Sequence, residues 1–161
     1  MQEKIRKCSG VIIYRHNQMH DEFEVLLIKT NNFRSQAGEY LHTIVGGRIE
    51  EQDAGETIEQ KAASCAARET QEEVRLGISQ IVYFGMKTAE GKDIGYKDPD
   101  MHFEFYNFTA KAEGELNIEK ILEANNEVIY AGFHRRQELS ELAMEPELKK
   151  MIEETITHKS T

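Results

Sequence analysis

The sequence has few cysteines and no long apolar run. Cys8 and Cys65 are the only cysteines in 161 residues, and their wide separation argues against both a disulfide framework and a zinc site. No run of about 18 apolar residues could span a membrane, and the first ten residues, MQEKIRKCSG, lack the apolar core of a signal peptide. We therefore expect a cytoplasmic protein with reduced thiols that does not insert into a membrane.

Basic residues are also fewer than acidic ones: the chain has 20 Lys and Arg and 29 Asp and Glu, which gives a formal charge of −9. Extended nucleic-acid-binding faces depend on clustered Lys and Arg, so we expect none here. A phosphate-bearing ligand would need a local cation. At 161 residues the chain is long enough to bury a core without metal or disulfide staples, and we expect one domain over residues 1–161.

The strand signals are spread along the whole chain. Residues 8–15 (CSGVIIYR) and 23–30 (FEVLLIKT) are rich in β-branched side chains, and their polar connection predicts a hairpin. A short strand at 41–45 is expected to stop at Gly46 and Gly47. Further strands are predicted at 78–89, 101–112 and 127–133.

Helical patterns alternate irregularly with these strands. Small side chains predict a helix from about Thr57 to Leu76, with Gly77 as its stop. Residues 135–144 and 146–157 predict two amphipathic helices. Because the order shows no strict βαβ rhythm, we expect an α/β fold with a mixed β-sheet flanked by helices.

The stretch 68–73, RETQEE, places three glutamates on one helical stripe. Each helical residue turns the axis by about 100°, so Glu72 and Glu73 lie at about 300° and about 40° from Glu69. Like charges at these spacings oppose helix formation by about 0.2 to 0.5 kcal/mol per pair, which a cation would relieve. Arg68 and Arg75 could do so as ordinary surface ion pairs. Alternatively, the three carboxylates form a hard-oxygen site suited to Mg²⁺ or Mn²⁺.

Three motifs occur around this stripe: GGRIE at 46–50, GET at 55–57 and RETQEE at 68–73. Together they resemble the Nudix box, G, five residues, E, seven residues, REUxEExGU, where U is a bulky aliphatic residue. The chain is similar in this respect to MutT-like Nudix hydrolases. The resemblance implies a Nudix-like α/β/α sandwich around a mixed sheet.

The spacing departs from the usual box. Eight residues separate Gly47 from Glu56 where the pattern has five, and eleven separate Glu56 from Arg68 where it has seven. Four additional residues amount to about one turn, so the helix could start a turn earlier without rotating the glutamates. Alternatively, Gln60, at the regular spacing, replaces the first glutamate. Arg75 stands where the box has glycine, so we expect a remodelled helix end.

The resemblance implies a metal site. Glu69, Glu72 and Glu73 would bind Mg²⁺ or Mn²⁺, and the carbonyl of Gly47 would be an additional ligand. Many family members take another acidic ligand from a later loop, for which the candidates here are Glu119, Glu123 and Glu127.

The family's reaction is hydrolysis of a nucleoside diphosphate linked to another group, X. The metal neutralises phosphate charge and activates water. Glu72 or Glu73 would hold that water or take its proton, and the sequence does not separate them. Arg68 would orient a box glutamate through a bidentate ion pair.

Substrate-binding candidates lie in two loops and beside the glycines. Phe33 could stack on a base while Arg34 meets phosphate, and Tyr96 with Lys97 could do the same from a later loop. Arg48, directly after the two glycines, is a further candidate. The sequence does not identify X.

Two other interpretations remain open. The same fold could bind a nucleotide or an ADP-ribose-like ligand without hydrolysing it, although the intact glutamates argue against this. Alternatively, the chain is an acidic α/β domain whose glutamates form a solvated face, and the absence of metal binding would favour that interpretation. In either hydrolase or binder the expected partner is a nucleotide-type small molecule, and the sequence is compatible with a homodimer.

Overall fold

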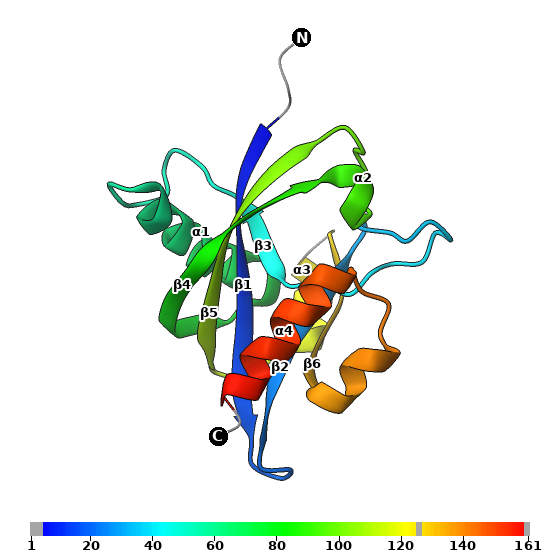
Figure 1. Ribbon diagram of the computed structural model, residues 1–161. Helices are drawn as coiled ribbons and strands as arrows, with labels where there is room; N and C mark the ends of the chain where they lie inside the picture. Colours follow the sequence, from blue (N-terminus) through cyan, green and yellow to red (C-terminus); the bar gives the residue numbers. More distant parts are fainter. Residues whose placement is uncertain (1–4, 125–126, 160–161) are drawn as a thin grey trace.

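The computed structural model describes residues 5–124 and 127–159, and its centre is one mixed sheet (Figure 1). The strand order is β4-β5-β1-β2-β6, and β3 pairs with β1 beside this path. The strands are β1 (Ile5–Asn17), β2 (Glu22–Thr30), β3 (Val45–Arg48), β4 (Gly77–Glu90), β5 (His102–Glu113) and β6 (Val128–Arg135). Strand β1 runs parallel to β5, whereas the other pairs are antiparallel. The predicted mixed sheet is confirmed.

Strand β1 changes partners along one of its edges. Its C-terminal end, residues 14–17, forms the predicted hairpin with β2, whereas residues 8–11 nearer its start pair with β3. Strands β2 and β3 therefore occupy successive stretches of the same edge of β1. This arrangement brings Gly46 and Gly47 beside the first half of β1.

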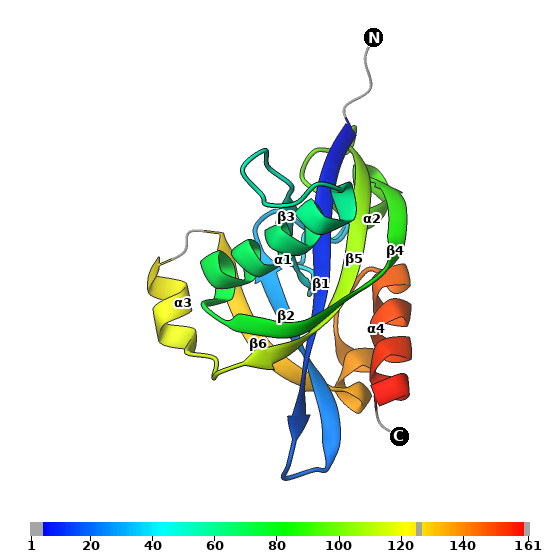
Figure 2. The ribbon, with the colours of Figure 1, turned by 90° about the vertical axis from the view of Figure 1, so that its left-hand side faces the viewer.

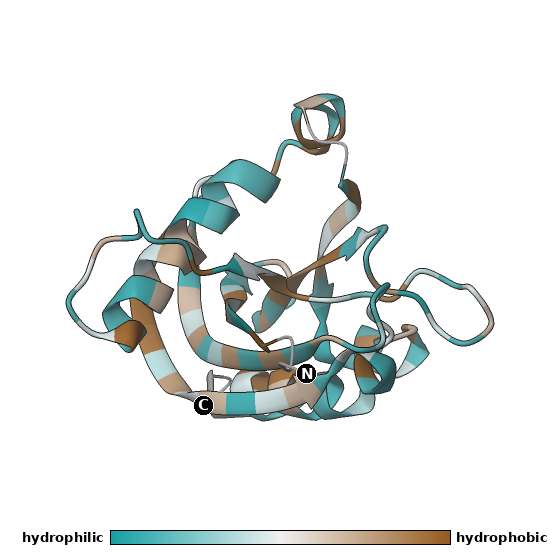
Figure 3. Cartoon of the chain, turned by 90° about the horizontal axis from the view of Figure 1, so that it is seen from above, coloured by the Kyte–Doolittle hydropathy of each residue, from teal (hydrophilic) through white to brown (hydrophobic). Residues whose placement is uncertain are grey.

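Two helices cover opposite faces of the sheet, α1 (Ile58–Val74) on one and α4 (Pro146–Lys159) on the other (Figures 1 and 2). Side chains alternate across a strand, so Val11 and Ile13 of β1 join the cluster that includes Ala62 and Ala66 of α1. Ile12 lies on the other face, in the cluster containing Ile152 and Ile156 of α4. Because both clusters are apolar, the central strands carry hydrophobic residues toward both faces, and brown segments mark such residues along the strands in Figure 3.

Helix α1 begins at a capping box. The Thr57 side chain accepts a hydrogen bond from the Gln60 backbone N–H (3.1 Å), and Gln60 Oε1 accepts from the backbone N–H groups of Thr57 and Glu56. All the residues from Ile58 to Arg68 are helical. The four additional residues between Glu56 and Arg68 thus lie in the helix, and Gln60 caps its first turn.

The expected helix end was wrong. Helix α1 ends at Val74, and Arg75 is its C-cap in the left-handed conformation, with φ 56°. Gly77, predicted to be the stop, begins β4. Because the left-handed conformation normally favours glycine, Arg75 adopts it at some cost in strain.

Three other local expectations also need correction. Strand β3 is Val45–Arg48 and contains both glycines, because they lie opposite Gly10 and Ser9 of β1, where a Cβ on Gly46 would collide with the Ser9 carbonyl. Residues 136–141 form a 3₁₀ helix, η1 (Arg136–Glu141), whose Glu138 turns back to bond His134 of β6. The connections contain two unforeseen helices, α2 (Gly91–Ile94) and α3 (Ile118–Ala124).

Across the described ranges 5–124 and 127–159, no helix is long and apolar enough to cross a membrane.

Candidate functional site

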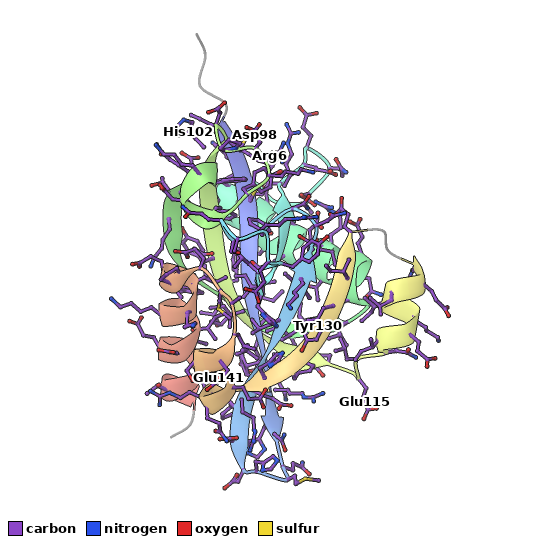
Figure 4. All side chains as sticks on the ribbon, turned by 90° about the vertical axis from the view of Figure 1, so that its right-hand side faces the viewer. Arg6, Asp98, His102, Glu115, Tyr130 and Glu141 are labelled. Atoms are coloured by element: carbon purple, nitrogen blue, oxygen red, sulfur yellow. The ribbon has the colours of Figure 1, made fainter. Side chains whose placement is uncertain are left out.

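A cavity of about 770 Å³ opens on the face of the sheet that also carries α4. Strand β5 contributes Phe103, Phe105 and Asn107 to its wall, which are alternate residues and therefore point to one face. Their register partners on β1, in the same order, also line it: Arg6, Cys8 and Gly10. Figure 4 shows Arg6 at the end of the molecule where Asp98 and His102 also lie.

The two glycines of β3 allow α1 to reach the cavity. A Cβ at Gly47 would collide with the carboxyl carbon and Oε1 of Glu69 and would lie 2.8 Å from its Cγ. Only a residue without a side chain can therefore accept the Glu69 carboxyl group against this backbone. Gly46, Gly47, Glu69 and Glu73 all line the cavity.

Glu69 and Glu73 form a tightly coupled acidic pair. Burial, first, and then the charge of Glu69 raise the pKa of Glu73 well above its ordinary range. A protonated Glu73 donates a hydrogen bond to Glu69, whose own pKa is raised by burial. Two carboxyl groups crowded together in this way favour a shared proton or a bound cation. The pair, with the Gly47 backbone against it, fits an oxygen-liganded divalent metal.

Glu72 lies differently from the other two glutamates of the stripe. Its side chain is 58% exposed, does not line the cavity, and accepts a long hydrogen bond of 3.4 Å from Arg68 Nη1. Within the part of the chain that the structure describes, no three His, Cys, Asp or Glu side chains are arranged as a ready-made metal site. The structure thus brings two of the three predicted carboxylates together and leaves Glu72 at the surface.

The three candidates for the later acidic metal ligand differ in their position relative to the cavity. Glu127 lines the cavity, and its charge contributes to the raised pKa of Glu73. Glu119 and Glu123 lie exposed on α3 and are not part of the cavity lining. The geometry therefore favours Glu127 among the three.

Arg68 has a different bidentate partner from the one expected. Its Nε and Nη2 donate to the two carboxylate oxygens of Asp53, at 2.8 and 3.1 Å. Only Nη1 is directed to the box glutamates, with 2.9 Å to Glu69 Oε1. The hydrogen bond from Arg68 is the leading cause of the lowered pKa of Asp53. The prediction of a bidentate pair between Arg68 and a box glutamate was wrong, because a buried carboxylate from the preceding loop occupies the guanidinium fork.

The two loops singled out for substrate binding meet over the cavity. Phe33 and Tyr96 form an isolated antiparallel bridge, and their ring centroids are 5.3 Å apart. The Tyr96 hydroxyl also accepts a hydrogen bond from Arg6 (3.0 Å). Both aromatic residues line the cavity, together with Lys97.

The two arginines proposed for the substrate are placed differently. Arg48 is exposed and lines the cavity. Arg34 is outside the lining, and its guanidinium lies over the Tyr40 ring at 4.3 Å and donates to the Tyr40 hydroxyl. The structure therefore does not bring Arg34 to the candidate site.

Sequence reasoning missed several cavity residues. Alternation of apolar side chains in HFEFYNF gives Phe103 and Phe105 a common face, which was a usable signal. Arg6 and Asn107 reach the cavity through the parallel register of β1 and β5, which no local pattern reveals. Asp53 lies outside the cavity lining, and no local pattern reveals its pairing with Arg68, fifteen residues away.

Comparison with protein families gives one clear match: a model of the NUDIX domain matches residues 6–155. No curated protein matches the sequence at a significant level.

Solved structures share the architecture at low sequence identity. The NUDIX domain of NrtR from Shewanella oneidensis, complexed with ADP ribose, superposes with a TM-score of 0.70 and 14% identity, covering 100% of this chain and 90% of that one. A NUDIX hydrolase from Alicyclobacillus acidocaldarius gives 0.67 and 15%, covering 98% and 93%. A MutT protein from Bacillus halodurans gives 0.60 and 20%, covering 94% and 82%. At these identities the likeness concerns the fold.

Proposed function

Since the chain belongs to the Nudix family, we propose that it hydrolyses a nucleoside diphosphate linked to another group, using Mg²⁺ or Mn²⁺. One observation carries this proposal: Glu69 is crowded against the Gly47 backbone and coupled to the buried Glu73, inside a cavity that also presents aromatic rings and basic side chains. Carboxylates, rings and cations are the groups that a metal, a base and phosphates respectively require.

Glu69, Glu73 and the Gly47 carbonyl would hold the metal, and Glu127 would supply the later acidic ligand. Glu72 would join them on leaving its long contact with Arg68, which its exposure permits. The chemistry supplied by a divalent cation here is neutralisation of phosphate charge and a lowered pKa of water. Glu72 or Glu73 accepts the proton of the attacking water, and Arg68 keeps Glu69 oriented through its single hydrogen bond.

The substrate would lie along the cavity from the glutamates to the paired loops. The rings of Phe33 and Tyr96 offer a stacking surface for a base, held in place by the bridge between their loops. Arg48 and Lys97 supply cations for phosphate within a chain whose formal charge is −9.

A panel of nucleoside diphosphate derivatives, incubated with Mg²⁺ and resolved by chromatography, tests this function. We expect hydrolysis of at least one member, its abolition by EDTA, and a large loss in Glu72→Gln or Glu73→Gln. Glu59→Gln, an exposed carboxylate on the same helix outside the cavity, is the matched control and should keep its activity. Full turnover in metal-free buffer would contradict the proposal.

The rival function is ligand binding without hydrolysis. Calorimetric titration with the same panel distinguishes the two, because a binder would retain an intact nucleotide that the hydrolase converts to two products. Saturable binding with no product in the presence of Mg²⁺ would favour the rival.

A further inference from the structure

The loop between β3 and α1 carries a buried carboxylate. Asp53 lies in residues 48–55, the stretch in which the chain is longer than the usual box, and its side chain is 2% exposed. Glu56 and Gln60, the two sequence candidates for the place of the box's leading glutamate, are exposed and take part in the cap of α1. Asp53 is the residue of this loop that occupies the Arg68 fork, whereas Glu50 makes only a distant ion pair with Arg68, at 4.0 Å.

Asp53 is held from two sides. Its Oδ2 accepts the backbone N–H of Glu50 at 2.8 Å, while both of its oxygens accept from Arg68. A buried carboxylate is tolerated only when it is paired and hydrogen-bonded. This fork therefore fixes the plane of the guanidinium, because two parallel hydrogen bonds leave it no freedom to rotate.

The fixed plane of the guanidinium determines which of its nitrogen atoms can contact the glutamates. With Nε and Nη2 engaged by Asp53, Nη2 also reaches the Arg48 carbonyl (3.1 Å), and Nη1 alone is left for the glutamates. Arg68 consequently makes one short contact to Glu69, through Oε1. A guanidinium released from Asp53 could instead fork onto a glutamate and occupy both of its oxygens.

We propose that Asp53 is a positioning residue for the metal site: it restrains Arg68 so that Glu69 is oriented by a single hydrogen bond and retains an oxygen for the cation. This role rests on the proposed function, because it presumes that Glu69 and Glu73 bind a divalent metal. Partners of this kind, which act through a ligand, typically change metal affinity by about 10- to 100-fold when they are removed.

The test is Mn²⁺ binding, measured by the free Mn²⁺ signal in electron paramagnetic resonance, at a temperature well below each variant's melting temperature. Asp53→Asn keeps the size of the side chain but removes the charge that holds the fork. We expect its dissociation constant for Mn²⁺ to rise by about 10- to 100-fold.

Two matched controls separate positioning from a general effect on the loop. Ser64→Ala removes another tether of the same loop, the 2.7 Å hydrogen bond from Ser64 Oγ to the Ala54 carbonyl, without touching Arg68. Glu51→Gln removes an exposed loop charge. Both should bind Mn²⁺ like the wild type. Wild-type affinity in Asp53→Asn, or equal weakening in all three variants, would overturn the assignment.

Failure of the proposed function is distinguishable from failure of this inference. If the wild type itself binds no Mn²⁺, the proposed function fails and takes the inference with it. If the wild type binds and Asp53→Asn binds equally well, only the inference fails.

A second variant covers the case in which Asp53→Asn does not fold. The double substitution Asp53→Asn with Arg68→Gln neutralises both partners of the fork, so neither is left as an unpaired charge. Its Mn²⁺ dissociation constant should also rise by about 10-fold or more, because Glu69 loses its orienting hydrogen bond. Wild-type affinity in the folded double variant would overturn the role of the pair.

Discussion

Glu73→Gln should make the protein more stable without metal and less stable with it. The glutamine keeps the size of the side chain and can donate a hydrogen bond to Glu69, as the protonated glutamate does. It cannot take up the negative charge that burial and Glu69 oppose.

Without metal, the effect depends on pH. Because the pKa of Glu73 is raised in the folded state, the folded protein holds this proton more tightly than the unfolded chain, and stability falls as pH rises above about 4.5. The glutamine variant lacks this loss. A like-charge pair on a solvated helix costs about 0.2 to 0.5 kcal/mol, and burial of Glu73 makes the relief larger. Melting temperature at pH 7 should therefore rise by about 1 °C or more.

With metal, mass action reverses the order. A cation at 100 times its dissociation constant stabilises a folded protein by about 2.7 kcal/mol, or about 5 to 10 °C for a chain of this size. If loss of the Glu73 ligand weakens binding about tenfold, the same concentration stabilises the variant by only about 1.4 kcal/mol. The variant should then melt below the wild type.

The assay consists of thermal melts of both proteins at pH 7, with EDTA and with Mg²⁺, alongside a rate measurement. Activity of Glu73→Gln should fall by on the order of 10² or more. Glu59→Gln should show neither the crossing of melting temperatures nor the loss of activity. Equal Mg²⁺ stabilisation of the wild type and Glu73→Gln would refute the assignment of Glu73 as a ligand.

Three further substitutions test other parts of the structure. Gly47→Ala should weaken Mn²⁺ binding by about 10-fold or more, since its Cβ displaces the Glu69 carboxyl group; unchanged affinity by titration would contradict this. Arg75→Gly should raise the free energy of unfolding in urea by roughly 0.5 to 1 kcal/mol, because glycine adopts the left-handed cap without strain, whereas Arg75→Ala should give no such gain. Burial and the charge of Lys29 lower the pKa of His42 to about 4, so between pH 7 and pH 5 the unfolded chain binds a proton that the folded protein does not. The free energy of unfolding should therefore fall by on the order of 1–2 kcal/mol over this range. Urea unfolding of His42→Gln should lack this component.

Much of the fold followed from local patterns. The hairpin of β1 and β2 and the run of α1 were readable because β-branched alternation and helical periodicity act over a few residues. Helix α1 ends before the predicted glycine stop because Arg75 adopts the left-handed conformation that usually requires glycine. The 3₁₀ helix η1 was misjudged because Glu138 bonds back to β6, a contact that helical periodicity does not encode.

The site could be predicted only in part, because local patterns do not encode contacts between distant segments. Helical geometry placed Glu69, Glu72 and Glu73 on one stripe, but it could not tell which of them turn into a cavity. That depended on the approach of α1 to the Gly47 backbone, which brings Glu69 to the cavity while Glu72 stays exposed beside Arg68. Likewise, three acidic residues in a later segment were equivalent in sequence, and only the packing of the chain brings Glu127 to the cavity.

The elements, the box and the stripe of carboxylates depend on neighbours along the chain, so they could be predicted from the sequence. Contacts between distant segments depend on the packing of the whole chain. The fork between Asp53 and Arg68 and the meeting of Phe33 with Tyr96 join segments that are far apart in sequence. Such pairs form because burial makes an unpaired charge or backbone group costly, and burial is fixed only when the whole chain has packed.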